Sequence, residues 1–177
     1  MAAEDGVIGA YTVLLGETGM RKSEGLRLKG QHIRQRERMV LIGRAKSGKV
    51  RSVPLSDLAL EWLGKVIRFI DIPLVFVDPV RNRPWLDPRT PFARGKAKAN
   101  LEWVGFHGLR HFRATQWLIH GVDVNTVKEL LGHATIQTTM RYAHYVQTHA
   151  LKAVRGAQRN EAEEWRQSVD TKRRQGR

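Results

Sequence analysis

Apolar residues recur at helical spacing along most of this chain, which predicts a mainly helical protein. We expect helices over residues 8–15, 22–28, 57–69, 91–100, 108–120 and 124–131, and a further helix from residue 135. Ser56 and Asp123 each precede an amphipathic run, so both are predicted N-caps. Gly121 and Gly132 are predicted to end the helices before them, and residues 16–19 to end the first helix.

Between residues 31 and 55 the pattern changes to extended segments. Residues 31–43 end in an apolar run, residues 50–55 form a second segment, and residues 45–49 make a turn that contains glycine. Together they predict a β-hairpin with a basic tip. Residues 72–91 hold five of the six prolines and are predicted to be loop, with 75–77 a short extended piece. The predicted fold class is therefore mainly α with a small antiparallel β-sheet (α+β).

The length and composition favour one domain. A chain of 177 residues suits a single core, which we assign to residues 1–155. Residues 156–177 are expected to form a charged, partly disordered helix or tail that frays after about residue 166. Because no apolar run is long enough to span a bilayer and the acidic residues 1–6 are no secretory signal, no membrane partner is expected. The lack of cysteine excludes disulfides and thiolate metal ligands.

The balance of charge gives the first indication of function. Lys and Arg total 31 against 17 Asp and Glu, a formal net charge of +14. Such an excess favours a polyanionic partner, most commonly nucleic acid, although a merely soluble or ribosomal-type basic protein would show the same balance. The sequence contains neither a glycine-rich phosphate loop nor a nucleotide fingerprint, so no cofactor and no small-molecule substrate are expected.

Several residues could together break a DNA phosphodiester without a metal. The transition state needs fixed cations on the non-bridging oxygens, a nucleophile, and an acid for the leaving oxygen. The candidates are Arg21, Lys46, His107, Arg110, His133 and Tyr142. His107 and Arg110 lie three apart at the start of a helix and so share one face. His107 and His111 have the spacing of a metal-binding pair, but no acidic residue accompanies them, and no metal is expected.

Four segments resemble the sequence boxes of the tyrosine recombinase (phage integrase) family. They are residues 18–24 with the first arginine, 46–55 with a hairpin lysine, 107–111 with a His-x-x-Arg pattern, and 131–133, followed nine residues after His133 by Tyr142. Each box alone is a weak signal, whereas four boxes in the family's order are a strong one. The resemblance implies the fold of the family's catalytic domain. It also implies cleavage and rejoining of double-stranded DNA through a 3′-phosphotyrosine, with neither metal nor ATP.

The resemblance assigns a role to each main candidate. Arg21 and Arg110 would clamp the scissile phosphate, and His133 would hydrogen-bond to it. Lys46 would protonate the 5′ oxygen that leaves. Tyr142 would be the nucleophile, and the spacing of nine residues from His133 singles it out among the tyrosines.

Other residues have supporting or alternative assignments. His107 is the best candidate to handle the tyrosine proton, and Glu24 to orient the first arginine. Lys49 remains open as a substitute for the hairpin lysine, and Tyr145 as a rival nucleophile. His111 is expected to pack. Further DNA contacts are expected at Lys49, Arg51, Arg94, Lys96, Lys98 and Arg113.

The same resemblance implies a homo-oligomer, a tetramer on two DNA sites, docked by the helix after Tyr142. Family members carry an N-terminal DNA-binding domain, and with only 17 residues before the first box that domain is expected to be absent here. A cytoplasmic, nucleoid-associated location in a prokaryote, phage or mobile element is expected. A type IB topoisomerase-like enzyme, a catalytically silent or truncated DNA-binding remnant and a metal nuclease are the alternatives.

Overall fold

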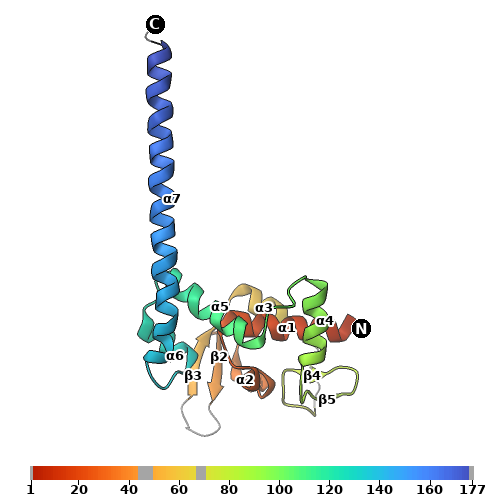
Figure 1. Ribbon diagram of the computed structural model, residues 1–177. Coiled ribbons are helices and arrows are strands. Elements are labelled where there is room, and N and C mark those ends of the chain that lie inside the picture. The colour runs from red at the N-terminus through yellow and green to blue at the C-terminus, as the bar shows by residue number, and fades with distance from the viewer. Residues whose placement is uncertain (1, 44–49, 67–70, 176–177) are drawn as a thin grey trace.

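The computed structural model describes residues 2–43, 50–66 and 71–175, and most of them are helical (Figure 1). The helices are α1 (Ala2–Thr18), α2 (Lys22–Leu26), α3 (Asp57–Gly64), α4 (Arg89–Lys98), α5 (Phe106–Ile119), α6 (Val124–Leu131) and α7 (Gln137–Gln175), with a 3₁₀ turn η1 (Gly30–His32). The strands are β1 (Ile33–Arg34), β2 (Met39–Gly43), β3 (Val50–Pro54), β4 (Val77–Asp78) and β5 (Arg83–Pro84). The fold class predicted from the sequence, mainly α with a small antiparallel sheet, is confirmed.

The larger sheet has the order β1-β2-β3 and is antiparallel. Val40 of β2 lies opposite Val53 of β3, and both side chains are fully buried. Ile42 and Arg51 are the next pair on the same face, because residues two apart along a strand share a face. The predicted hairpin of β2 and β3 is confirmed, but the first predicted segment, residues 31–43, is not a single strand. It begins in η1 and contains the short β1, which folds back and pairs with β2. The predicted tip of the hairpin, with both candidate lysines, falls in residues 44–49, which lie outside the described residues.

Helix α1 is the centre of the larger core and packs against α3, α4 and α5. The ring of its buried Tyr11 meets Phe76 edge-on, with 5.0 Å between the ring centroids. The Tyr11 hydroxyl donates a hydrogen bond of 2.7 Å to the Lys22 carbonyl, so the polar end of this aromatic residue is satisfied in the core. A smaller cluster at the α5, α6 and α7 contact contains Ala114, Val127, Leu131 and Tyr142.

The predicted helix caps are present. The Ser56 hydroxyl accepts from the amide of Ala59 at 3.2 Å at the start of α3. The Asp123 carboxylate accepts from two amides of the first turn of α6. Gly132 ends α6 in the left-handed conformation, with φ of 66°. Helix α3 ends at Gly64, and part of its predicted range lies among residues outside the described part of the chain.

Two helices run further than predicted. Helix α1 continues through Gly16 to Thr18, and the chain turns one residue later at Gly19, whose φ is +61°. Helix α7 continues to Gln175, past the point where fraying was expected, because its sequence holds no proline and a single glycine, Gly156. It projects well beyond the rest of the molecule (Figure 1). None of the described helices is apolar over a length that would cross a bilayer.

Candidate active site

The C-terminal end of α6 gathers three arginines from three separate elements. Each donates to a different carbonyl: Arg51 to Leu130 at 2.8 Å, Arg110 to Leu131 at 2.8 Å, and Arg21 to Gly132 at 3.5 Å. The last carbonyls of a helix lack partners within the helix and carry the negative end of its dipole. The end of α6 is therefore a fixed, partly negative platform that holds three guanidinium groups side by side.

Gly132 makes this platform possible. Its positive φ is a conformation that glycine adopts without a steric penalty. A Cβ atom at this position would lie 3.0 Å from Nη1 of Arg51, closer than nine in ten such contacts, so the Arg51 side chain would have to shift. The glycine therefore both ends α6 and leaves room for the Arg51 side chain, directly before His133.

Arg21 is held from two sides at the start of α2. The Glu24 carboxylate accepts from the Arg21 amide at 2.7 Å and from its guanidinium at 3.1 Å. Burial alone would raise the pKa of Glu24, but the hydrogen bond from Arg51 and that from the Arg21 amide hold the pKa below its ordinary value. The Arg21 side chain is 38% exposed, so its guanidinium is anchored and still accessible to a ligand.

Arg110 forms the buried floor of the site, with 2% of its surface exposed. Besides Leu131, its guanidinium donates to the carbonyl of Gly19 at 2.7 Å. Burial, and then the neighbouring charge of Arg21, lowers the pKa of Arg110 to about 10. The side chain is therefore still a cation at neutral pH, with its position set by backbone carbonyls from both ends of the site.

Tyr142 lies beside these cations on α7 and is 3% exposed. Two imidazole rings contact it: His111 at 5.2 Å between centroids, and His133 at 6.3 Å in a stacked arrangement. Burial raises the pKa of the Tyr142 phenol, while the charges of Arg110 and Arg141 act in the opposite direction. At neutral pH the phenol is protonated, so it must give up its proton in order to act as a nucleophile.

The histidines near Tyr142 are neutral at physiological pH. Burial, and then the charges of Arg110 and Arg21, lowers the pKa of His133 to about 4. Its Nδ1 forms a hydrogen bond of 2.8 Å with the hydroxyl of buried Thr139. Burial, and then the neighbouring His107, lowers the pKa of His111 as well.

The structure thus brings together most of the residues singled out in the sequence. Arg21, Glu24, Arg110, His133 and Tyr142 lie in one connected set of contacts. The exposed His107 reaches this set through His111, since the two rings meet edge-on at 4.2 Å. His111, which was expected only to pack, is the histidine that contacts the Tyr142 ring from α5. Sequence reasoning also passed over Arg141, although it directly precedes the tyrosine.

Two residues expected to contact DNA have other partners. The side chain of Arg51 is 12% exposed and binds Glu24 through both of its terminal nitrogens. Arg113 binds Glu17 and the Gly16 carbonyl. The pattern of β3 could have indicated the Arg51 arrangement, because Arg51 shares the inward face of that strand with buried Val53.

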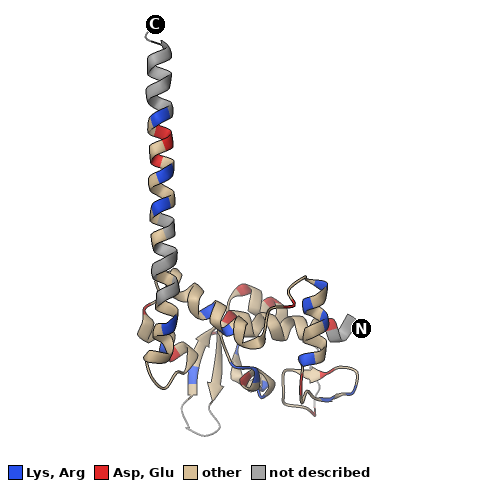
Figure 2. Cartoon of the chain, viewed as in Figure 1, with Lys and Arg blue, Asp and Glu red and all other residues tan. Residues whose placement is uncertain are grey.

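Three other candidate DNA contacts, Arg94, Lys96 and Lys98, lie on α4, at the opposite end of the body from α6 (Figure 1). The remaining candidate, Lys49, lies outside the described residues. Basic positions are spread over many elements of the chain, α4 included (Figure 2). Lys96 donates to the carbonyl of Glu102 at 2.8 Å, and Lys98 pairs with Asp5 at 2.8 Å.

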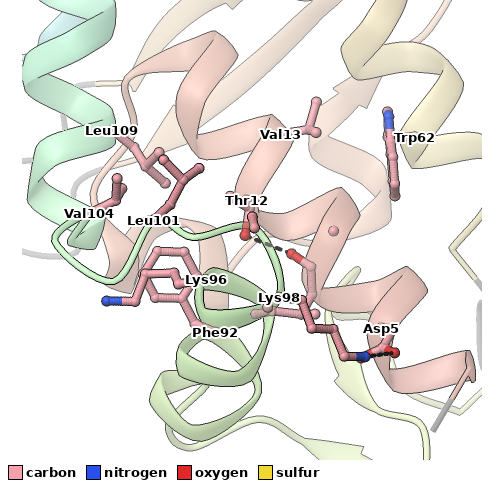
Figure 3. A pocket seen from close by; sticks show the side chains of 14 residues that line it. Asp5, Thr12, Val13, Trp62, Phe92, Lys96, Lys98, Leu101, Val104 and Leu109 are labelled. Atoms are coloured by element: carbon pink, nitrogen blue, oxygen red, sulfur yellow. Dashed lines mark hydrogen bonds and ion pairs between the residues drawn. The ribbon is translucent and has the colours of Figure 1, made fainter.

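A separate cavity of about 410 Å³ lies between α1, α3, α4 and the segment before α5. Its walls are mostly apolar and include Trp62, Phe92 and Leu101, with the Lys98–Asp5 pair at one side (Figure 3). It includes none of the residues gathered at the end of α6. Within the part of the chain that the structure describes, no three His, Cys, Asp or Glu residues are placed to hold a metal ion.

Comparison with known proteins supports one family. The model of the phage integrase family matches residues 5–149. The tyrosine recombinase XerA of Pyrococcus furiosus is 34% identical over 151 residues, which cover 82% of this chain and 52% of that protein. The chain spans about half the length of the curated relatives it matches.

Solved structures agree. The crystal structure of XerA recombinase has a TM-score of 0.71 at 25% identity and covers 88% of this chain and 64% of its own. The XerH site-specific recombinase, bound to a palindromic difH substrate in a post-cleavage complex, has a TM-score of 0.67 at 27% identity. This match covers 82% of the present chain and 44% of that one.

Proposed function

This chain belongs to the phage integrase family, and from that premise we propose that it breaks and rejoins DNA strands at specific sites through a covalent bond to Tyr142. One observation carries the proposal: three guanidinium groups, fixed by backbone carbonyls, lie beside a buried tyrosine. Preorganised cations of this kind stabilise the negative charge that develops on a phosphate under attack. Among these three arginines and Glu24, positive charge is in excess, which suits an anionic substrate.

In the proposed reaction the Tyr142 hydroxyl oxygen attacks the scissile phosphorus. A bond between that oxygen and phosphorus forms, and the bond from phosphorus to the 5′ oxygen breaks. The products are a 3′-phosphotyrosine and a free 5′-hydroxyl. Because the new ester conserves the bond energy, a 5′-hydroxyl of a partner strand can reverse the step without ATP. Arg21, accessible and anchored, and Arg110, buried below it, neutralise charge on the non-bridging oxygens.

Two protons must move in this step. The phenol proton of Tyr142 passes to the His111–His107 pair, whose rings lie in contact with each other and, through His111, with the tyrosine. Neutral His133 donates a hydrogen bond to the phosphate through the nitrogen that does not bind Thr139. Lys46, which lies outside the described residues, is proposed on its sequence box alone as the acid for the 5′ oxygen.

The proposed substrate is double-stranded DNA, and the proposed working unit is a tetramer of this chain on two sites. The net charge of +14 and the DNA-bound XerH neighbour support the substrate. Projecting α7 exposes Leu151, Val154 and Trp165, and the apolar cavity beside α4 is a candidate surface for such residues of a second copy. Acting on DNA in a prokaryotic cell, the protein would work in the cytoplasm.

The direct test uses the chain with a random-sequence pool of nicked duplexes, in EDTA. We expect a protein–DNA adduct that resists denaturant, sits on a 3′ DNA end, and disappears in Tyr142→Phe. Tyr145→Phe is the matched control and should still form the adduct. An adduct retained in Tyr142→Phe would identify another nucleophile. DNA binding without an adduct in the parent chain would support a catalytically silent binder. A parallel reaction without EDTA completes the test, because cutting that EDTA abolishes would indicate a metal nuclease.

A further inference from the structure

Resting on the proposed function, we infer that Arg51 is a positioning residue of the reaction: it holds Arg21 in place through Glu24 and does not touch DNA. The Arg51 side chain lies on β3 and is mostly buried. A side chain that binds the phosphate backbone of DNA would instead face the solvent and be exposed in the free protein. All described hydrogen bonds of the Arg51 side chain go to protein groups of the site.

Each oxygen of the Glu24 carboxylate accepts one hydrogen bond from Arg21 and one from Arg51. Oε1 accepts from Nη1 of Arg21 and Nη1 of Arg51, both at 3.1 Å. Oε2 accepts from the Arg21 amide at 2.7 Å and from Nη2 of Arg51 at 2.8 Å. A planar guanidinium can span both oxygens at once, whereas an ammonium group cannot. Arg51 therefore fixes the plane of the carboxylate that orients Arg21.

Arg51 also determines how much charge Arg21 can offer a phosphate. If the Glu24 carboxylate were paired with Arg21 alone, its negative charge would cancel the positive charge of the Arg21 guanidinium. With Arg51 present, two cations share one carboxylate, and a positive charge remains for the substrate. The network supplies orientation and charge together.

The third bond of Arg51 extends this control to α6. Its Nε donates to the Leu130 carbonyl, one residue before the carbonyl that receives Arg110. The Arg51 side chain can occupy this position because Gly132 has no side chain that would displace it. Strand β3, the start of α2 and the end of α6 are thus joined by one side chain, although they are far apart in sequence.

The experiment is a double-mutant cycle on the rate of adduct formation with a nicked duplex selected from the pool. We expect Arg51→Met to slow the reaction by about 10- to 100-fold, as misplacement of a catalytic group does, with DNA affinity nearly unchanged. Arg51→Lys keeps the positive charge but loses the planar guanidinium that binds both carboxylate oxygens, so it should recover part of the lost rate. In a Glu24→Gln background, Arg51→Met should cost less than about 3-fold, because residues that act through one another are not additive.

The control is Arg81→Met, which also removes an arginine from a mostly buried carboxylate, Asp78, in a part of the chain outside the site. It should lose stability without slowing the reaction per folded molecule. Multiplicative effects of Arg51→Met and Glu24→Gln, a rate for Arg51→Met equal to that of the parent, or a loss of DNA affinity equal to the loss of rate would each overturn the inference.

A second readout does not depend on activity. The Nε–H group of Arg21, identified by its loss in Arg21→Lys, should give an ordered NMR signal in the parent chain and a disordered one in Arg51→Met. Unchanged order would overturn the positioning role even if adducts form. Conversely, a parent chain that forms no adduct but loses Arg21 order in Arg51→Met would refute the proposed function and leave the positioning role standing.

Discussion

The arginine half and the tyrosine half of the site are held in different ways. Arg21, Arg51 and Arg110 are fixed by hydrogen bonds to Glu24 and to backbone carbonyls at the end of α6. Tyr142 is held by packing against Val127 and the other members of its cluster, and by the rings of two histidines.

This difference matches what each half must do. Groups that stabilise developing charge gain most from being rigid before the substrate arrives, because no reorganisation is then needed during the reaction. A nucleophile must instead stay protonated until a phosphate is present, and then adjust its approach. Burial keeps the Tyr142 phenol neutral, and packing contacts permit small movements that a hydrogen-bond network would resist.

The largest effect is expected where the arginine half is most rigid. Arg110→Met removes a buried cation and leaves the carbonyls of Gly19 and Leu131 without their donor. The rate of adduct formation should fall at least about 10³-fold, and stability by roughly 1–3 kcal/mol, the cost of buried acceptors left unpaired. Arg110→Lys should recover little, because a lysine cannot bridge both carbonyls. Single-turnover kinetics and thermal unfolding measure the two effects. An adduct rate for Arg110→Lys within about 3-fold of the parent rate would show that the planar guanidinium of Arg110 is not required.

A smaller effect is expected from the glycine that supports the same half. Gly132→Ala should cost about 1–2 kcal/mol for a side chain at positive φ and should displace Arg51, slowing the reaction by about 10-fold. Gly121→Ala is the matched control: its φ is +84°, but a Cβ there meets nothing within 4 Å. The control should lose comparable stability and no activity. Equal rates for the two variants would mean that Gly132 plays no part in positioning the arginines.

The halves also differ in how far the sequence predicted them. Helix caps such as Ser56, and the αL glycine after α6, depend on a few neighbouring residues, and these were predicted correctly. The alternation along β3 indicates only that Arg51 faces inward. Its partners, Glu24 at 27 residues away and Leu130 at 79 residues away, cannot be identified from the local pattern. The contact of His111 with Tyr142 likewise depends on how α5 packs against α7.

A pH titration compares the halves through His133, whose ring stacks on Tyr142 and whose pKa is lowered by burial and by the charges of the arginines. Its folded pKa of about 4 lies below the unfolded value of about 6.5. The stability linked to this group is therefore fully present above pH 6.5 and is lost as the pH falls toward 4. His111, whose pKa is also lowered, acts in the same direction. We expect the melting temperature to fall from pH 7 to pH 4.5, and to fall less in His133→Asn.

The same histidine should report on the substrate. An anion among the arginines would offset the charges that lower the His133 pKa, so added inorganic phosphate should raise it. NMR titration of the His133 ring, assigned by the asparagine variant, measures the pKa with and without phosphate. A free-protein value at or above 6.5 would mean that burial and the arginine charges do not lower the pKa of this ring as the structure indicates.

The smallest effect on activity is expected outside both halves. Ser56→Ala removes the N-cap of α3, whose hydroxyl accepts from the Ala59 amide, and should cost about 1 kcal/mol of stability. Helix α3 packs on α1 and supplies none of the side chains of either half. The adduct rate per folded molecule should therefore match that of the parent chain. If it falls as it does for Gly132→Ala, general loosening of the fold, and not the fixed arginines, sets the rate, and the contrast between the two halves no longer explains the chemistry.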